Sequence, residues 1–273
     1  MNEAQSEYGP LFSQECLNLP LSWHNEFDSS WLKTHSASFH NKDHITAVER
    51  ANTTYLERSN ENNDPLNLRR DLKEWNKQNP DSQFTYDELK ELMVLVARYH
   101  DTGNIISKLV VENGQLKPIY LPNYQAQGAE ERSQEIIEVV IRNLNLPEDK
   151  KEKYLKLAKH LINETKFNPD NKESPFAVSM RFFDQIGNGL FNENPNMIEG
   201  LIEELISENP NAQINPYFFY NFTRLRPAQL GITDETMKTI LEILDKTLPE
   251  EKQLPNEPVL ASEFLSSLNA RKT

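Results

Sequence analysis

Apolar residues recur every three to four positions along most of this 273-residue chain, the spacing that gathers them on one face of an α-helix. The clearest case is LKELMVLVARYHD, which follows Thr85 and Glu88, two residues spaced as a capping box at a helix start. Residues 108–122 depart from this pattern, because an Asn-Gly pair separates two short apolar runs as in a β-hairpin. We therefore expect an all-α fold with at most one short hairpin.

The helical segments follow one another without a linker that would divide the chain. Ser174 followed by Pro175 predicts one helix start, since Ser favours the N-cap position and Pro the first turn. We expect one domain with an N-terminal extension over residues 1–30, a core over 31–190, and C-terminal helices over 191–273 packed on that core. The other predicted helices span approximately 43–58, 85–101, 130–144, 149–167, 195–207, 233–248 and 258–270.

Composition excludes several classes of protein. No run of 18 apolar residues exists, so we expect no membrane span, and the first residues lack the basic and apolar regions of a Sec-type signal peptide. A single cysteine, Cys16, cannot form a disulfide within the chain, which fits a reducing, cytoplasmic location. The net charge of −13 argues against binding of long nucleic acid, whereas a small phosphorylated substrate held through a metal stays compatible with it.

Two histidines open the predicted helix over 43–58. His40 and His44 are four residues apart, which places them on the same side of a helix, one turn from each other. His44 lies near the centre of the helix's apolar face. That face also contains Ala47, Val48, Ala51 and Tyr55.

A second polar pair, His100 and Asp101, ends the predicted helix that begins near Thr85. An aspartate at a helix C-terminus is not favoured by the helix dipole, so it needs another partner. Asp184 lies at the edge of the inner face of the helix predicted to begin at Ser174. A shared divalent cation would satisfy all these buried groups, because imidazole and carboxylate are the ligands expected for Mn, Fe, Co, Ni or Zn and, with fewer histidines, Mg.

The order of these residues resembles the H…HD…D signature of the HD-domain superfamily of metal-dependent phosphohydrolases. The stretch FHNKDH at 39–44 is similar to the YHNxxH motif of the cyclic nucleotide phosphodiesterase branch and of bacterial HD phosphohydrolases, and HDTGN at 100–104 is similar to the HDxG form. AEERS at 129–133 resembles the NExxS motif of a bacterial branch, with Ala129 where that family has Asn. INETKFN at 162–168 resembles the same branch's I-x-x-T-x-x-H segment, with Asn168 in place of His. The resemblance covers about residues 31–190.

The resemblance implies an HD-domain helical bundle whose catalytic core is that segment. It implies a divalent metal, one of Mn, Mg, Fe, Co, Ni or Zn, held by His44, His100, Asp101 and Asp184. It further implies that His40 protonates the leaving group while Asp101 or Glu130 accepts the proton of a metal-activated water. The expected activity is that of a phosphomonoesterase or phosphodiesterase acting on a small phosphate ester such as a nucleotide.

Three cations are candidates for contact with substrate phosphate: Lys42 beside the first motif, and Arg224 and Arg226 within the aromatic segment 217–231. The alternative is a solvated Lys42 and a core helix that carries two surface arginines. Segment 105–128 follows the His-Asp pair directly, so we expect it to lie over the site. The remaining histidines lack a supporting pattern: we expect His160 on the surface, and His24 and His35 in solvent or in loops.

Two rival functions remain open on the same scaffold. A di-iron oxygenase would need further histidine ligands, and only His160 is at hand. A binding or regulatory module without turnover would suit the acidic surface and the last third of the chain, which matches the family pattern only loosely. The complete set of four ligands together with His40 favours the enzyme.

Overall fold

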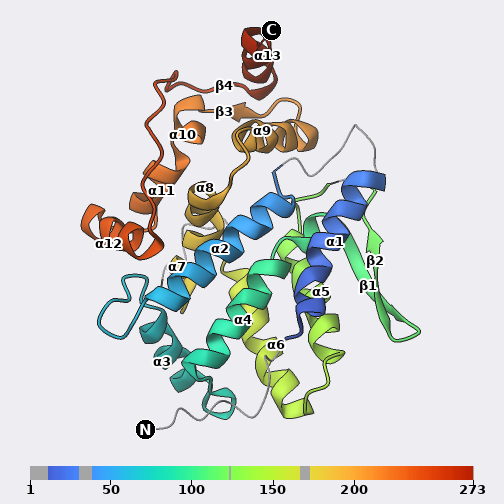
Figure 1. Cartoon of the computed structure of the whole chain (residues 1–273). Coiled ribbons are helices and arrows are strands. Elements are labelled where there is room, and N and C mark those ends of the chain that lie inside the picture. The colour runs from blue at the N-terminus through green and yellow to red at the C-terminus, as the bar shows by residue number, and fades with distance from the viewer. Residues whose placement is uncertain (1–11, 31–38, 123, 167–172, 273) are drawn as a thin grey trace.

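The computed structural model describes residues 12–30, 39–122, 124–166 and 173–272, and its described part is mostly helical (Figure 1). Its two sheets are antiparallel pairs of strands, β1 with β2 and β3 with β4. The all-α prediction is therefore confirmed. His35 and Asn168 lie outside the described residues. No helix in the described part of the chain has both the length and the apolar character needed to cross a membrane.

The helices take the following bounds: α1 (Gln14–Ser30), α2 (Lys42–Arg58), α3 (Leu68–Gln78), α4 (Tyr86–Tyr99), α5 (Ala129–Arg142), α6 (Glu148–Asn163), α7 (Ala177–Arg181), α8 (Asn188–Phe191), α9 (Met197–Glu208), α10 (Pro216–Tyr220), α11 (Phe222–Gln229), α12 (Asp234–Leu244) and α13 (Ala261–Lys272). Two short 3-10 turns, η1 (Pro80–Ser82) and η2 (Thr102–Asn104), and one π-helical turn, η3 (Phe182–Gly187), join them. The strands are β1 (Ile106–Glu112), β2 (Gln115–Tyr120), β3 (Gln213–Ile214) and β4 (Val259–Leu260).

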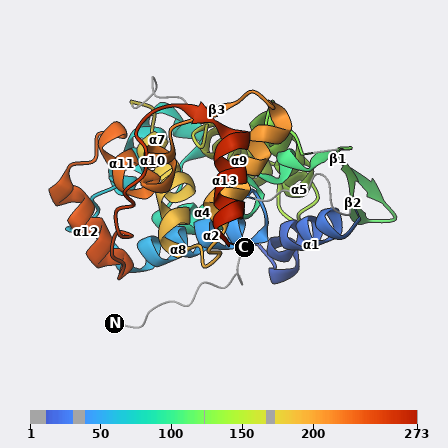
Figure 2. The same ribbon diagram turned by 90° about the horizontal axis from the view of Figure 1, so that it is seen from above.

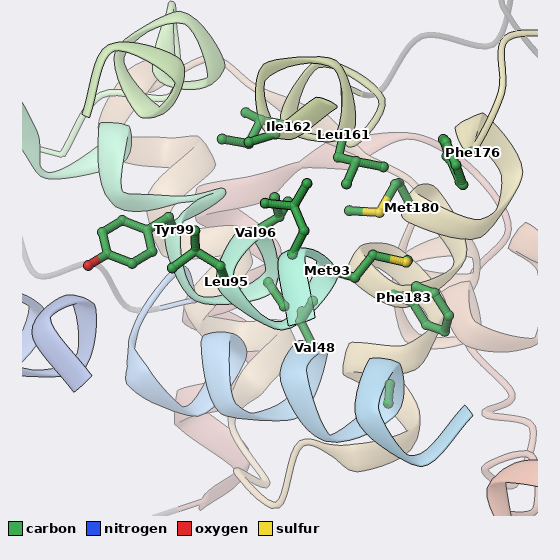
Figure 3. Close-up of a cluster of buried hydrophobic side chains, with 14 of the residues drawn as sticks. Val48, Met93, Leu95, Val96, Tyr99, Leu161, Ile162, Phe176, Met180 and Phe183 are labelled. Atoms are coloured by element: carbon green, nitrogen blue, oxygen red, sulfur yellow. The ribbon is translucent and has the colours of Figure 1, made fainter. Parts of the chain in front are cut away.

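Helix α4 lies at the centre of the main core and contacts α1, α2, α5 and α6. Its inner residues Met93 and Val96 are fully buried, and Figure 3 shows them among side chains from α2, α6 and α7. The predicted capping box is confirmed: the Glu88 N–H donates to Thr85 Oγ1 at 3.2 Å, and the Thr85 N–H donates to Glu88 Oε2 at 2.8 Å. The cap fixes where α4 begins, and packing fixes which face points inward.

The N-terminal segment contributes a helix to this core. Helix α1 packs against α4 and α2, with Trp23 and Phe27 buried and the Trp23 ring set edge-on against Tyr99 at 5.9 Å between centroids. Figure 1 shows α1 lying across the bundle beside the hairpin. Pro20 lies inside this helix, where a proline is not expected from the sequence pattern of a regular helix. The division at residues 30 and 190 stays a prediction.

The predicted hairpin is confirmed. Strands β1 and β2 pair antiparallel from Ile106 opposite Tyr120 to Glu112 opposite Gln115. The two turn residues, Asn113 and Gly114, have φ of 53° and 76°. Positive φ at both central positions is the geometry of a type I′ turn, which explains why an Asn-Gly pair occupies it.

The helix predicted from Ser174 begins later. The Ser174 hydroxyl donates to Glu164 at 2.6 Å instead of capping, and Phe176 takes a left-handed conformation with φ of 67° before α7 starts at Ala177. The Phe176 N–H donates to the buried carboxylate of Asp71 at 2.8 Å. Tertiary hydrogen bonds therefore override the local capping signal.

The C-terminal residues form a layer of helices, part of which packs on the main core and part of which has a small apolar core of its own. Helix α12 packs on α2 and adds Ile240 to the main core, and α11 packs on η3. Helices α9 and α13 enclose a smaller apolar cluster around Ile202, Ile214 and Ala261. Figure 2 shows α13 running across α9 when the molecule is seen from above. This layer closes one end of the helices that carry the polar motifs.

Candidate metal centre

The four predicted ligand side chains converge. His44 comes from the first turn of α2, His100 from the C-cap of α4, Asp101 from the next position, and Asp184 from η3. One ligand atom from each lies within 4.8 Å of the others, so the group can hold a metal ion. Both histidines are buried, with 1% exposure each.

The two imidazole Nε2 atoms face the same point. His44 Nε2 lies 2.8 Å from Asp101 Oδ2 and 3.2 Å from Asp184 Oδ1. His100 Nε2 lies 3.1 Å and 3.3 Å from the same two oxygens, and 3.3 Å from His44 Nε2. Asp101 Oδ2 is buried yet accepts no hydrogen bond of good geometry. A buried carboxylate oxygen without a hydrogen-bond donor, next to two imidazole nitrogens, is suited to binding a cation.

The tautomer of His100 suits ligation. Its Nδ1 lies 3.0 Å from the Ala97 carbonyl oxygen, which can only accept, so Nδ1 carries the hydrogen. In the neutral ring, which is the form that binds a metal, Nε2 then carries the lone pair, and Nε2 is the atom that lies at the cluster. A hydrogen bond inside the last turn of α4 thus orients the ring.

The charges of the cluster support one another. Burial lowers the pKa of His100, but the carboxylates of Asp101 and Asp184 outweigh it and hold that pKa well above its usual value. Burial raises the pKa of Asp101, and the opposing charges of His100 and His40 hold it well below its usual value. Protons therefore compete for the site, and a bound cation would release them.

Local hydrogen bonds fix each element. The Asn41 side chain accepts from the N–H groups of Asp43 and His44 at 2.8 and 3.3 Å, which starts α2 at the motif. After Asp101, the Gly103 N–H donates to Ser133 Oγ at 2.9 Å, and a Cβ on Gly103 would lie 2.0 Å from the Ala129 carbonyl oxygen. Gly103 and Ser133 therefore dock the HDTGN turn onto the start of α5.

Asp184 lies within a π-helical turn. The extra residue of such a turn re-aims a side chain inside an otherwise regular helix, and these turns are frequent at functional sites. Gly187 ends the turn against α2, where an added Cβ would lie 2.7 Å from the Ala51 Cβ. Close packing of η3 on α2 thus brings Asp184 toward His44.

His40 lies beside the cluster and is bound by a residue that sequence analysis missed. Glu204 on α9 is buried; its Oε1 accepts from the N–H groups of Phe39 and His40 at 2.7 and 3.0 Å, and its Oε2 lies 2.6 Å from His40 Nδ1. The Tyr124 hydroxyl lies 2.8 Å from the same ring nitrogen. Burial lowers the pKa of His40, but the carboxylates of Glu204, Asp101 and Asp184 raise it to about 9. His40 is therefore positively charged at neutral pH.

No short motif marks Glu204. It lies within the run IEELIS, where a glutamate next to apolar residues on a surface helix is ordinarily exposed. The only available signal is its place one position before Leu205, near the apolar face of α9.

The expectation for His24 is wrong. It lies on α1 with 0% exposure, and neither ring nitrogen has a hydrogen-bond partner. Burial lowers its pKa to about 3, and the charge of Asp101 opposes the shift. A neutral histidine therefore lies within electrostatic reach of the cluster.

The expectation of a surface His160 is also wrong. Its Nε2 donates to the Pro175 carbonyl oxygen at 2.9 Å, and its ring packs on Trp75 at 4.8 Å between centroids. It is half-buried and lies outside the His–Asp group. On a helical wheel of α6, His160 falls outside the apolar stripe. In the structure, α3 and the chain before α7 cover that side of α6.

Glu130 is part of the cavity lining, and its role as proton acceptor stays a prediction, whereas the three candidate phosphate contacts are not among the lining residues. Burial raises the pKa of the Glu130 carboxyl, with the charge of Asp101 adding to the rise. Lys42 is exposed, and Arg224 donates to the Pro249 carbonyl oxygen at 2.8 Å. Arg226 is buried and donates to the side chains of Gln185 and Gln229, both at 2.8 Å. Their role in substrate binding stays a prediction.

A cavity of about 550 Å³ opens above the cluster. Its lining includes His40, His44, Asp101, Glu130 and Asp184, together with side chains from α9, α10 and α11. Tyr124 and Ala126, from the segment expected to lie over the site, also line it. The arrangement places a group that could hold a metal ion, together with His40 and the Glu130 carboxyl, around one space that can hold a small molecule.

No protein family, curated protein or solved structure matches this chain. The helical fold and the His–Asp cluster are compatible with the HD-domain resemblance.

Proposed function

We propose that this chain is a metal-dependent phosphohydrolase of the HD-domain type. One observation carries the proposal: the buried His44 and His100 and the partly buried Asp101 and Asp184 converge at the side of a cavity that His40 also lines. The donor set, two imidazoles and two carboxylates, suits a first-row divalent ion. The order of these residues along the chain supports the same assignment.

When bound, a divalent ion supplies Lewis acidity toward a phosphoryl oxygen and lowers the pKa of a coordinated water. The chain supplies the proton transfers. His40 lines the cavity and its Nδ1 is engaged by Glu204, which leaves Nε2 as the nitrogen available to protonate the leaving oxygen. Glu130, whose pKa burial raises, is the neighbouring carboxyl suited to take up a proton from water.

Metal content is the first test. Purified chain is loaded in turn with Mn, Fe, Co, Ni, Zn or Mg, desalted, and measured by inductively coupled plasma mass spectrometry beside His100→Ala and Asp184→Asn. We expect bound metal in the wild type and its loss in both variants. His160→Ala, which removes a half-buried histidine outside the cluster, is the matched control and is expected to keep the metal. Equal metal content in wild type and His100→Ala would contradict the proposed site.

Turnover is the second test. Each loaded form is offered p-nitrophenyl phosphate and bis(p-nitrophenyl) phosphate, and release of p-nitrophenolate is followed by absorbance. Hydrolysis that disappears in His100→Ala supports the phosphohydrolase. Metal binding without hydrolysis of either ester would favour the binding module. Two iron ions per chain with consumption of O₂ would favour the oxygenase.

A further inference from the structure

The part of the cavity lining that lies outside the His–Asp cluster and comes from the C-terminal helices is built almost entirely from hydrocarbon. It is formed by α9, α10 and α11, the part of the chain that the family resemblance does not cover. Its side chains include Ile198, Leu201, Leu205, Phe218 and Phe222. Phe218 and Phe222 stack edge to face, with centroids 5.4 Å apart. Such a wall favours an apolar group over water.

Three amide side chains line the cavity, those of Asn104, Gln185 and Asn188, and the last two are engaged by the protein itself. Gln185 accepts from Arg226 at 2.8 Å and donates to the Thr165 carbonyl oxygen at 3.4 Å. Asn188 accepts from Asn192 at 3.0 Å and its Nδ2 lies 3.4 Å from the Met197 sulfur. The polar edge of a nucleoside needs several dedicated partners when it is buried. These two amides offer few.

Few positively charged side chains lie around the cavity. Asp101, Asp184 and Glu130 line it, and no lysine or arginine does so among the residues that the structure describes. His40 also lines the cavity, with its Nδ1 2.6 Å from Glu204 Oε2, and a bound metal would supply positive charge there. A phosphomonoester carries between one and two negative charges at neutral pH, because its second pKa is about 6, whereas a diester carries one. The site is therefore better matched to a monoanion.

We propose that this cavity takes a phosphodiester with an apolar arm, alkyl or aryl, which lies against the wall formed by α9, α10 and α11. The proposal rests on the phosphohydrolase function proposed above and narrows its substrate class. In the reaction, the oxygen of water forms a bond to phosphorus while the bond from phosphorus to the leaving oxygen breaks. The leaving oxygen gains a proton from His40, and water loses one to Glu130. The products are an alcohol and a phosphomonoester.

Binding of non-hydrolysable phosphinates tests the proposal without turnover. Dimethylphosphinate and methyl(phenyl)phosphinate each carry one negative charge and differ only in one arm. Isothermal titration calorimetry on metal-loaded protein is expected to show the phenyl compound binding on the order of 10-fold tighter or more, because its ring buries additional apolar surface. Equal affinities would overturn the proposal, and so would tighter binding of the dianion phenylphosphonate.

Two leucines provide a matched pair of variants. Leu201→Trp fills the cavity from α9, and Leu241→Trp makes the same change at a half-buried leucine on α12 outside the cavity lining. We expect Leu201→Trp to remove the preference for the phenyl arm and to keep the metal, while Leu241→Trp keeps both. The wild-type phosphinate series decides the proposal even where Leu201→Trp fails to fold.

Turnover separates this proposal from the one on which it rests. Methyl, phenyl and thymidine-5′ p-nitrophenyl phosphates all release p-nitrophenolate and differ only in the second arm. We expect the highest kcat/KM for the phenyl diester. A higher kcat/KM for the thymidine diester, or equal values for all three, would overturn the apolar arm while leaving the phosphohydrolase in place. Absence of metal binding and of all hydrolysis would instead overturn the phosphohydrolase itself.

Discussion

The helices that hold the His–Asp cluster and the helices that close the cavity differ in how they are stabilised. The cluster residues project from α2, α4 and η3, which belong to one large core containing Met93, Val96 and Phe183. Helices α9 and α13 enclose a much smaller cluster. Among the described residues, three buried apolar side chains form its centre, and half-buried side chains surround them. The first region is rigid enough to hold ligand geometry, and the second is better suited to adapting its shape to a substrate.

One residue links the two regions. Glu204 on α9 reaches across to the backbone and ring of His40, 164 positions earlier in the chain. The difference between the regions therefore leads to two expectations. A variant that disrupts the first region should lose the bound metal. A variant that disrupts the second region should keep the metal but misplace the proton donor His40 and the apolar arm of the substrate.

Metal binding provides the largest expected effect. A ligand that binds only the folded chain, present at 1,000 times its Kd, adds about 4 kcal/mol to the free energy of unfolding. We expect an increase of this size in wild type on addition of metal, measured by urea unfolding. Asp184→Asn, which removes a charged ligand from the first region, is expected to show almost none. An equal increase in both proteins would place the binding site elsewhere.

Glu204→Gln tests the link itself. Loss of the negative charge beside His40 Nδ1 is expected to lower kcat by about 100-fold or more, within the range of a general-acid contribution, with metal content unchanged. Glu203→Gln, an exposed neighbour on the same helix, is the matched control. Loss of metal in Glu204→Gln, or an unchanged kcat, would contradict the proposed division between the regions.

Glu204→Gln should also change how the stability of the metal-free protein depends on pH. The pKa of folded His40 is about 9, above its ordinary value of 6.5. Protonated His40 therefore contributes stability fully below about pH 6.5, and the contribution is lost as the pH rises through about 9. We expect wild type to exceed Glu204→Gln in free energy of unfolding at about pH 6, and the difference to shrink at about pH 9.5. NMR titration of the ring should show the pKa of His40 falling in the variant.

The sequence reveals the first region far better than the second. Helical periodicity fixes which face of α2 and α4 is buried, so His44 and His100 could be placed inward, and the His-Asp pair could be recognised by its motif. Asp184 was placed at the edge of a regular helix, although a π-helical turn aims it. Glu204 and His24 could not be found, because a buried charged or polar residue is defined by distant partners, here His40 and the cluster, and not by its own neighbours.

Two isoleucines compare the cores directly. Ile137 and Ile202 are both fully buried, the first in the main core and the second in the small C-terminal cluster. Ile137→Ala is expected to lower the global free energy of unfolding by about 3 kcal/mol through loss of packing and creation of a cavity. The change is measured by urea unfolding. Activity per folded molecule should stay unchanged.

Ile202→Ala is expected to act locally. We expect amide hydrogen exchange to increase in α9 and α13 and kcat to fall through looser placement of Glu204, while metal binding stays. A loss confined to global stability, with exchange in α9 unchanged, would show that the two cores unfold as one unit and would remove the distinction between the regions.

The smallest expected effects come from two exposed helix caps, one in each region. Thr85 caps α4 through the bond from the Glu88 N–H, and Thr233 caps α12 through a bond of 3.1 Å from the Thr236 N–H. Replacing either with Ala is expected to cost about 1 kcal/mol of unfolding free energy, measured by urea unfolding. His100 lies at the other end of α4 and is positioned by core packing, so Thr85→Ala should keep the metal. Thr233→Ala is the matched control, because both variants lose a single hydroxyl from an exposed helix start. Loss of metal in Thr85→Ala but not in Thr233→Ala would mean that the cap, and not core packing, sets the position of α4.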